Sequence, residues 1–333
     1  METSELKNEM KEKIRFGILG TADIAEKMIV PAVKTLHNCE VTAVASRSEE
    51  KAKQFASGFD IPKYYGSYEE LLADPEIDAV YNPLPVSLHP EWSIKSALAG
   101  KHVLCEKPLV ASSGEAERMV EVFEERDLML AEALMYRYHP LTLKFLEMIK
   151  EGAVGKPVSI QSDFHTLITD PDDIRLKKET GGGALLDLGV YCVSIIRNIA
   201  GEEPQDVKSF AEFNDRGVDV SFSGILKFPS GITGNFSCSL ISGFSCGYSV
   251  VGTEGKLLVD RGGMVPRPGE SFKIKHWKGE EYEEIVVPAA NHYALMIEDF
   301  SNSLLYGHPL KFGMQDTINN LKTIDKLMEA SKT

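Results

Sequence analysis

The amino-acid sequence predicts an α/β protein in which a doubly wound parallel sheet is followed by an α+β domain with an open, mostly antiparallel sheet. Two observations predict this fold class. Apolar strand-like runs alternate with amphipathic helical runs from residue 14 to residue 134, and such alternation is typical of parallel sheets with helical crossovers. Beyond residue 140, consecutive strand-like runs replace the alternation, which indicates an antiparallel sheet.

The N-terminal half contains short apolar runs that we predict as strands and periodic runs between them that we predict as helices. The predicted strands are 14–19, 41–46, 63–65, 79–82, 102–105 and 128–133. The predicted helices are 24–36, 49–58, 68–73, 91–99 and 113–126. Strands that alternate with helices in this way form a parallel sheet with helical crossovers.

The C-terminal half begins with a predicted helix and continues mainly with strands. A helix over 141–150 precedes an extended run over 157–164, and a second helix follows the glycines at 181–183. Strands are then predicted over 218–228, 231–240, 248–260 and 271–277, with a hairpin turn at 253–256 and final helices over 293–305 and 314–330. We therefore expect a disordered lead over residues 1–13, a first domain over 14–135 and a second over 136–333.

Composition limits the classes of partner. The net charge is −14, so a phosphate backbone or an anionic membrane surface would be repelled. The five cysteines include no C-x-x-C pair, and we expect free thiols in a reducing cytosol, with neither a disulfide framework nor a zinc site. The charged N-terminus lacks an apolar signal core, and the uncharged run 228–253 alternates like β-structure, so we expect a cytoplasmic protein.

A turn after the first predicted strand has the pattern of a dinucleotide-binding loop. Read from Gly20 the sequence is G-x-A-x-x-A, against the usual G-x-G-x-x-G/A. Gly20 permits a tight turn, Ala22 permits close approach of a pyrophosphate, and Ala25 permits close packing of helix on strand. The strand before it and the helix after it favour a Rossmann dinucleotide-binding domain over a turn without a ligand. The candidate cofactor residues here are Gly20, Thr21, Ala22, Asp23 and Ile24.

The end of the second predicted strand indicates which dinucleotide binds. NAD sites usually place Asp or Glu here to bind the ribose 2′-hydroxyl. This chain has Ser46 and Arg47, and a hydroxyl beside a guanidinium suits a 2′-phosphate. We therefore favour NADP as the cofactor, with NAD as the alternative if Arg47 is only a solvated loop residue.

The fourth and fifth predicted strands end in residues that point to a ligand site. Glu106-Lys107-Pro108 follows the fifth strand, and ligands of open α/β sheets bind at this edge. Lys107 is either held there for chemistry or tied up in a buried ion pair with Glu106. His89 follows the prolines that close the fourth strand, and it either contacts the ligand or has a structural role.

A mainly apolar helix after residue 183 carries a stripe of polar residues. Asp187, Tyr191, Ser194 and Asn198 recur at a spacing that lines one face. This face borders either a cleft or a polar seam against the other domain. A hydride transfer to nicotinamide needs a proton exchanged at the reacting oxygen, and either Tyr191 or Lys107 carries it. The Lys107 ammonium would lower the pKa of Tyr191 and hydrogen-bond the reacting oxygen. Asp187 would orient the substrate or Lys107.

These motifs together resemble the glucose–fructose oxidoreductase/inositol dehydrogenase family (Gfo/Idh/MocA) over nearly the whole chain. The most specific segments are Glu106-Lys107-Pro108 and the run from Gly182 to Tyr191. Many members carry His where this chain has Tyr191. The Tyr form, with Ser46-Arg47, 132–140 and 173–176, is similar to the NADP-dependent branch that contains D-xylose dehydrogenases, dihydrodiol dehydrogenases, glucose–fructose oxidoreductase and sugar 3-ketoreductases.

The resemblance implies roles for particular residues. Lys107 and Tyr191 would lie at the reacting carbon, with Asp187 beside them. The nicotinamide would be bordered by Glu106, Pro83, Leu84 and His89, and Arg175 would lie near cofactor or substrate. The resemblance also implies a homodimer or homotetramer formed through the sheet of the second domain.

We expect an oxidoreductase that moves a hydride between nicotinamide and a sugar carbon, first of all an aldose 1-dehydrogenase of the D-xylose type. The alternatives are a 3-ketosugar reductase that takes a nucleotide sugar and a trans-dihydrodiol dehydrogenase. An alternative of another class is a non-catalytic dinucleotide-binding sensor, which would not need Lys107, Asp187 and Tyr191 together.

Overall fold

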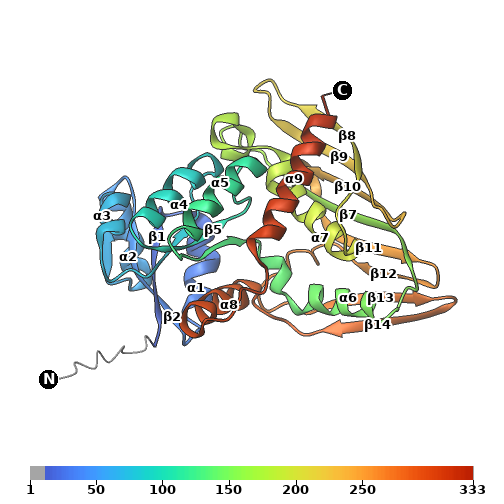
Figure 1. Cartoon of the computed structure of the whole chain (residues 1–333), viewed down its shortest axis with the longest axis horizontal. Helices are drawn as coiled ribbons and strands as arrows, with labels where there is room; N and C mark the ends of the chain where they lie inside the picture. Colours follow the sequence, from blue (N-terminus) through green and yellow to red (C-terminus); the bar gives the residue numbers. More distant parts are fainter. Residues whose placement is uncertain (1–11, 333) are drawn as a thin grey trace.

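The computed structural model describes residues 12–332, so most of the predicted lead over residues 1–13 lies outside the described residues. The described chain contains a six-stranded sheet in its N-terminal part and an eight-stranded sheet in its C-terminal part. Figure 1 shows the two sheets side by side, with helices between them. The predicted α/β class with a second, mostly antiparallel sheet is confirmed.

The first sheet is parallel throughout and has the strand order β3-β2-β1-β4-β5-β6. This order reverses direction between β1 and β4, where ligands of doubly wound folds bind. The strands are β1 Ile14–Leu19, β2 Cys39–Ala45, β3 Lys63–Tyr65, β4 Ala79–Asn82, β5 His102–Glu106 and β6 Leu130–Ala133. All six predicted strands are present, and their cores read as apolar because both faces of the sheet are covered.

The crossovers of this sheet are helical, as predicted. They are a π-helical turn Ala25–Ile29 continuing into α1 Val30–Val33, then α2 Glu49–Phe59, α3 Tyr68–Ala73, α4 His89–Leu98 and α5 Ser113–Glu124. Side chains cap three of these helices: Ser48, Ser67 and Ser112 accept hydrogen bonds from backbone N–H groups three residues on. The serine caps explain why the helix starts were predictable from the sequence.

The second sheet has the order β14-β13-β12-β11-β7-β10-β9-β8, with β7 and β10 parallel and the other neighbours antiparallel. Its strands are β7 Pro157–Leu167, β8 Asp206–Phe213, β9 Asp219–Lys227, β10 Thr233–Ser239, β11 Ile241–Gly252, β12 Gly255–Val259, β13 Phe272–Lys278 and β14 Glu281–Val287. The predicted hairpin turn lies between β11 and β12. The prediction missed β8 and β14, which are the two edge strands and carry many charged side chains.

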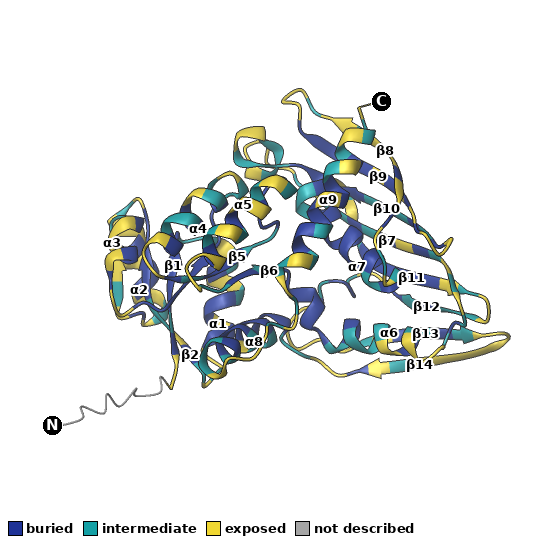
Figure 2. Cartoon of the chain, in the orientation of Figure 1, coloured by how far each residue is buried: buried dark blue, intermediate teal, exposed yellow. Residues whose placement is uncertain are grey.

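Helices cover only one face of the second sheet. α7 Val190–Ala200 packs on β7 and β10, α9 Met314–Ala330 packs on β8, and α6 Pro140–Lys150 packs on β13. Figure 1 shows these helices on the side that faces the first sheet, and Figure 2 shows dark buried residues there. α8 His292–Tyr306 returns to pack against α1 and β1. The opposite face of the sheet is bare of helices within the described chain.

The helix that carries the predicted polar stripe is a core element. Leu185–Gly189 forms a π-helical turn that runs into α7, whereas the sequence predicted one regular helix. Of the described helices, one stretch, Lys178–Ala200, is long and apolar enough to cross a membrane. It has a mean hydropathy of 1.4 and is 83% buried inside the protein, which is what packing between two sheets requires.

Candidate active site

A cavity of about 270 Å³ opens at the C-terminal edge of the first sheet, where the two halves of the chain meet. The predicted site residues that line it are Ile24, Pro83, Leu84, His89, Glu106, Lys107, Arg175, Asp187 and Tyr191. These residues come from five separated stretches of the chain, and the fold brings them together. The predicted residues Gly20 to Asp23, Ser46 and Arg47 are outside this lining.

Lys107 joins the two halves of the chain in the cavity. Its Nζ donates hydrogen bonds to Oδ1 of Asp187 at 2.6 Å and to the Asp187 carbonyl oxygen at 2.8 Å. An ammonium has three N–H donors, so one remains for a ligand. Glu106 accepts instead from the backbone N–H of Lys107 at 3.2 Å. The alternative in which the side chains of Glu106 and Lys107 form an ion pair is therefore wrong.

Asp187 is held in the cavity by the way its helix begins. The buried carboxylate of Asp219, on β9, accepts a hydrogen bond from the N–H of Leu185 at 2.7 Å. This bond satisfies one of the free N–H groups at the helix start. The carboxylate of Asp187 lies between Lys107 and Arg175, whose Nη1 is 3.9 Å from Oδ2. The Lys107 ammonium and the Arg175 guanidinium therefore both interact with the Asp187 carboxylate near the start of its helix.

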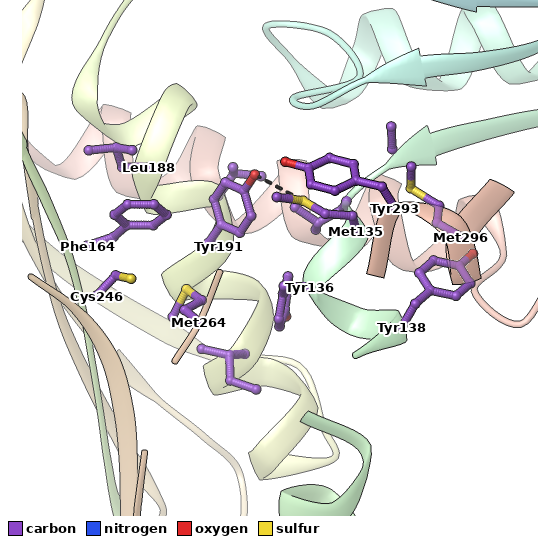
Figure 3. Close-up of a cluster of buried hydrophobic side chains, with 14 of the residues drawn as sticks. Met135, Tyr136, Tyr138, Phe164, Leu188, Tyr191, Cys246, Met264, Tyr293 and Met296 are labelled. Atoms are coloured by element: carbon purple, nitrogen blue, oxygen red, sulfur yellow. Dashed lines mark hydrogen bonds between the residues drawn. The ribbon is translucent and has the colours of Figure 1, made fainter. Parts of the chain in front are cut away.

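Tyr191 lies one turn after Asp187 and is buried, with only 4% of its surface exposed. Its hydroxyl donates to the sulfur of Met135 at 3.5 Å, a weak acceptor, as Figure 3 shows. The Lys107 Nζ is 5.2 Å from the centre of the Tyr191 ring. We expected Lys107 to lower the pKa of Tyr191, and this is wrong for the structure. Burial raises the pKa of Tyr191 well above its usual value, so the phenol keeps its proton.

Glu106 is anchored below the cavity by Tyr81. The Tyr81 hydroxyl donates to Oε1 of Glu106 at 2.5 Å, and the enclosed surroundings raise the pKa of this carboxyl. Tyr81 is itself fully buried on β4, so the carboxylate is fixed by the core of the first sheet. The Glu106 carboxylate is therefore a hydrogen-bond acceptor that is held in a fixed position at the wall of the cavity.

His89 is buried at the start of α4, and both of its ring nitrogens face backbone carbonyl oxygens. Nε2 is 2.7 Å from the oxygen of Leu84, and Nδ1 is 3.0 Å from the oxygen of Pro108 and 3.2 Å from that of Leu109. These contacts connect the loop after β4 to the segment after Lys107. Burial lowers the pKa of His89. The side chain has a structural role in addition to its place in the cavity lining.

The predicted dinucleotide turn lies beside the cavity, at the same sheet edge. Gly20 has a φ of +88°, the left-handed region that favours glycine, and a Cβ at this position would lie 3.2 Å from a methyl of Leu84. Asp23 is exposed and forms an ion pair with Lys27 at 2.5 Å. The negative charge of Asp23 is thus balanced on the surface of the helix by its own neighbour.

Ser46 and Arg47 directly follow β2 at the same sheet edge. Ser46 is buried, and its Oγ accepts from the N–H of Ser48 at 3.3 Å. Arg47 is exposed, and its guanidinium lies beside the hydroxyl of Tyr68, where it offsets part of the rise that burial causes in the pKa of that phenol. Tyr68 was not singled out in the sequence. It places an aromatic ring and a hydroxyl beside Gly20 and Arg47.

The polar stripe on α7 divides into two parts. Asp187 and Tyr191 line the cavity, but Ser194 accepts hydrogen bonds from Tyr136 at 2.8 Å and Arg137 at 3.2 Å. Asn198 donates to the carbonyl of Ser194 at 2.8 Å. The second part of the stripe is therefore a satisfied polar seam, which was the alternative interpretation.

Several cavity residues were missed from the sequence: Pro85, Val86, Pro108, Met135, Ile174, Thr180, Gly181, Gly182 and Tyr293. Tyr293 has the clearest signal in hindsight, because Asn291 before it accepts from the N–H groups of Tyr293 and Ala294 and so marks a helix start. A helix start near a sheet edge is a common place for a functional side chain, but only the fold shows which sheet edge is near.

The comparisons with known proteins agree with this geometry. A family model described as "Oxidoreductase family, NAD-binding Rossmann fold" matches residues 14–134, and the model of the GFO/IDH/MocA C-terminal domain matches residues 142–258. This chain belongs to the Gfo/Idh/MocA oxidoreductase family. The family resemblance inferred from Glu106-Lys107-Pro108 and from the run before Tyr191 is confirmed.

Relatives within the Gfo/Idh/MocA family act on different molecules. The chain is 36% identical to D-xylose 1-dehydrogenase (NADP(+)) 2 of Haloferax volcanii, over 96% of this chain and 97% of the relative. It is 32% identical to trans-1,2-dihydrobenzene-1,2-diol dehydrogenase of Bos taurus, over 81% and 86%. The solved structure of a 3-ketoreductase from Actinomadura kijaniata, in complex with NADP and TDP-benzene, has a TM-score of 0.90 at 31% identity and covers 96% of this chain and 98% of that one.

Proposed function

We propose that this protein is an NADP-dependent oxidoreductase that moves a hydride between nicotinamide and a pyranose carbon, and that it is an aldose 1-dehydrogenase of the D-xylose type. The observation that carries the proposal is the contact of Lys107 with Asp187 beside Tyr191, in a cavity at the edge of the first sheet. A dinucleotide sensor has no need of these three side chains together. Their geometry supports catalysis.

Three residues of the chain share the work of the proton transfer: one binds the reacting oxygen, one transfers the proton and one positions the first. Bound NADP supplies the hydride acceptor, and the oxygen on the reacting carbon must then release its proton. Lys107 has one N–H left to hold that oxygen, because Asp187 takes the other two. Tyr191 is buried and carries its proton, so it acts as the acid when a ketone is reduced. When a sugar is oxidised, the phenol must first lose this proton to solvent, and the phenolate beside the Lys107 ammonium then takes the proton of the reacting hydroxyl. Asp187 fixes the direction of the Lys107 ammonium.

Binding of NADP is supported by the surface beside the cavity. Gly20 has a left-handed backbone conformation and no side chain, so the backbone N–H groups at the helix start are accessible to a pyrophosphate. We propose that Thr21, Ala22, Asp23 and Ile24 form this turn around the cofactor. The exposed Arg47 guanidinium and the Ser46 hydroxyl fit the 2′-phosphate that distinguishes NADP from NAD.

The size of the cavity favours a free sugar over a nucleotide sugar. At about 270 Å³ it lies just below the usual range of about 300 to 1,000 Å³ for ligand pockets. Nicotinamide must share this space with the substrate. The Arg175 guanidinium, which could otherwise take a diphosphate, is held by two bonds to Asp173 at 3.0 and 2.8 Å. A 3-ketosugar reductase remains the second candidate because a 3-ketoreductase shares the fold at a TM-score of 0.90.

The test is a turnover screen of the purified full-length chain with NADP⁺ and NAD⁺. We expect D-xylose or another free aldose to be oxidised with NADP⁺. Failure to turn over any free aldose, together with reduction of a nucleotide-linked 3-ketosugar by NADPH, would replace the first candidate with the second. Binding of the dinucleotide with no turnover of any sugar, ketosugar or dihydrodiol would favour a sensor.

We further propose how the chain is organised and where it works. The domain division at residues 135 and 136 is supported by the change from the first sheet to the linker at His139-Pro140. A homodimer or homotetramer through the bare face of the second sheet is supported by the apolar side chains exposed there. A cytoplasmic location is supported by five buried free cysteines.

A further inference from the structure

Tyr293 is the polar side chain of the cavity that the structure leaves without a partner. It lies at the start of α8, lines the cavity, and exposes only 6% of its surface. Buried tyrosine hydroxyls usually find a hydrogen-bond partner. Among the described residues, the Tyr293 hydroxyl has none, although its backbone N–H is bonded to the side chain of Asn291 at 3.1 Å. Its hydroxyl is therefore available to a ligand.

The other polar side chains of the cavity are already engaged with protein atoms. Lys107 bonds to Asp187, Glu106 to Tyr81, and His89 to backbone carbonyls. Arg175 is paired with Asp173, and the Thr180 hydroxyl bonds to the carbonyl of Lys177 at 2.9 Å. Tyr191 has only a thioether as its partner. The weakly bonded Tyr191 and the unbonded Tyr293 are thus the hydroxyls that a ligand can recruit at least cost.

The two phenols face one another. Figure 3 shows the hydroxyls of Tyr191 and Tyr293 pointing toward each other beside the sulfur of Met135. The nearness of Tyr293 contributes to the raised pKa of Tyr191, although burial is the larger cause. No direct hydrogen bond joins the two hydroxyls among the described contacts. Facing donors that do not bond to each other can both contact one ligand oxygen placed between them.

We infer that Tyr293 is a further catalytic residue, whose hydroxyl donates a hydrogen bond to the oxygen on the reacting carbon from the side opposite Tyr191. The inference rests on the proposed function. With the free N–H of Lys107, it gives that oxygen three donors. In both directions the transition state carries partial alkoxide charge on this oxygen, and donors fixed in advance stabilise that charge. The proton still comes from or goes to Tyr191, and Tyr293 keeps its own.

The test compares Tyr293→Phe with Tyr136→Phe in the full chain, using the sugar that the turnover screen identifies. Tyr136 is a matched control because it is buried in the same aromatic cluster but bonds to Ser194 outside the cavity. We expect Tyr293→Phe to lower kcat/KM by about 100-fold, as the loss of one oxyanion donor does. The dissociation constant of NADPH, measured by its fluorescence, and the melting temperature should stay unchanged, because Phe keeps the ring and no protein bond is lost.

Other outcomes overturn the inference. An unchanged kcat/KM, or a loss that is explained by weaker NADPH binding, would remove Tyr293 from the reacting oxygen. A loss that vanishes with a substrate lacking the neighbouring hydroxyl would place the contact on that hydroxyl instead. Tyr191→Phe separates this inference from the proposed function. Full turnover by Tyr191→Phe would overturn both, whereas its loss beside wild-type behaviour of Tyr293→Phe would overturn only the role of Tyr293.

Discussion

At the scale of single residues, the site depends on which hydrogen bonds are already made before a ligand arrives. Asp187 takes two donors of Lys107 and so fixes the direction of the third. Tyr191 has no strong acceptor, which leaves its proton available for the reaction. Arg47 is exposed in the turn after β2, where its charge can bind an anionic group without breaking a buried ion pair.

Replacing Lys107 should remove most of the activity. We expect Lys107→Met to lower kcat by about 10²- to 10³-fold, because the reacting oxygen loses a charged donor. Lys95→Met is the control, since it also removes a lysine from an ion pair, with Glu91, but on the exposed side of α4. Steady-state kinetics with saturating NADP⁺ measure the effect. Wild-type kcat in Lys107→Met would show that the cation has no part in the chemistry.

Replacing Arg47 should weaken NADP binding selectively. A charge-assisted bond contributes about 1.5–3 kcal/mol, so Arg47→Ala should raise the Kd of NADPH by about 10- to 100-fold and leave the Kd of NADH unchanged. Lys53→Ala removes the same charge from the exposed side of α2 and should change neither value. Fluorescence titrations measure all four constants. Equal losses for NADPH and NADH would contradict a specific contact with the 2′-phosphate.

At the scale of elements, the site depends on how two helices begin. The π-helical turn before α7 carries Asp187 and is fixed by the Asp219 carboxylate, while α8 carries Tyr293 and is fixed by Asn291. Free N–H groups at a helix start need an acceptor, and a buried one fixes the helix position as well. Packing therefore sets the directions of two side chains that come from opposite ends of the second half.

Removing the acceptor at the start of the π-helical turn should affect both stability and activity. Asp219→Ala leaves the N–H of Leu185 unsatisfied, and we expect a loss of about 1–2 kcal/mol in the free energy of unfolding. kcat should fall as well, because Asp187 follows Leu185 on the same turn. Asp219→Asn keeps an acceptor oxygen and should retain both properties. Urea unfolding and kinetics test this, and equal behaviour of the two variants would contradict the role of the carboxylate oxygen.

A buried histidine pair should make the protein sensitive to acid. His139 precedes α6, His292 begins α8, and their ring centres are 5.6 Å apart. Burial lowers the pKa of His139 to about 4 and that of His292 to about 3. Below the unfolded pKa of about 6.5, the unfolded chain takes up protons that the folded chain does not. The contribution of these two histidines to the free energy of unfolding is therefore complete above pH 6.5 and is lost as the pH falls toward 4.

The expected size is about 1.4 kcal/mol per pH unit for each histidine in this range. The measurement is the free energy of unfolding in urea between pH 7 and pH 5. The double variant His139→Asn/His292→Asn should show a shallower slope, and Asn at residue 139 can still accept from the N–H of Leu141. His308→Asn changes an exposed histidine and should keep the wild-type slope. An equal slope in the double variant would remove the pair as the cause.

At the scale of the whole molecule, the cavity lies on one side of the second sheet and a bare face lies on the other. Strand alternation sends large apolar side chains to this outer face: Phe210, Ile225, Val251, Tyr282 and Val286 are 42 to 81% exposed. They come from β8, β9, β11 and β14, so they extend across the sheet. Exposed apolar side chains that gather on one face are typical of interaction sites, which supports the proposed subunit contact there. A second copy of the chain can cover it without blocking the cavity.

A charge at the middle of this face should weaken self-association. We expect Val251→Arg to shift the chain toward monomer in light-scattering measurements at micromolar concentration, while kcat per chain stays near that of the wild type. Leu98→Arg is the control, because Leu98 is also an exposed apolar residue but lies at the end of α4 on the first half. A wild-type mass for Val251→Arg would place the subunit contact elsewhere.

The sequence by itself determined the first sheet, the dinucleotide turn, and the Glu106-Lys107-Pro108 and Asp187–Tyr191 segments. Each of these features follows from a local sequence pattern: the alternation of strands and helices, a serine at a helix start or the position of a glycine. It also determined the family. The edge strands β8 and β14 were not predicted, because their many charged, exposed residues mask the alternation of apolar and polar residues that marks a strand packed on a core.

Only the tertiary structure decided how these segments act together. Lys107 and Asp187 are 80 residues apart, and nothing local states that they bond. The pKa of Tyr191 is raised because packing between two sheets removes water from the phenol, which no local pattern shows. Tyr293 enters the site because α8 returns to the first sheet. Local sequence sets backbone preference, whereas solvation and long-range contact exist only once the chain has folded.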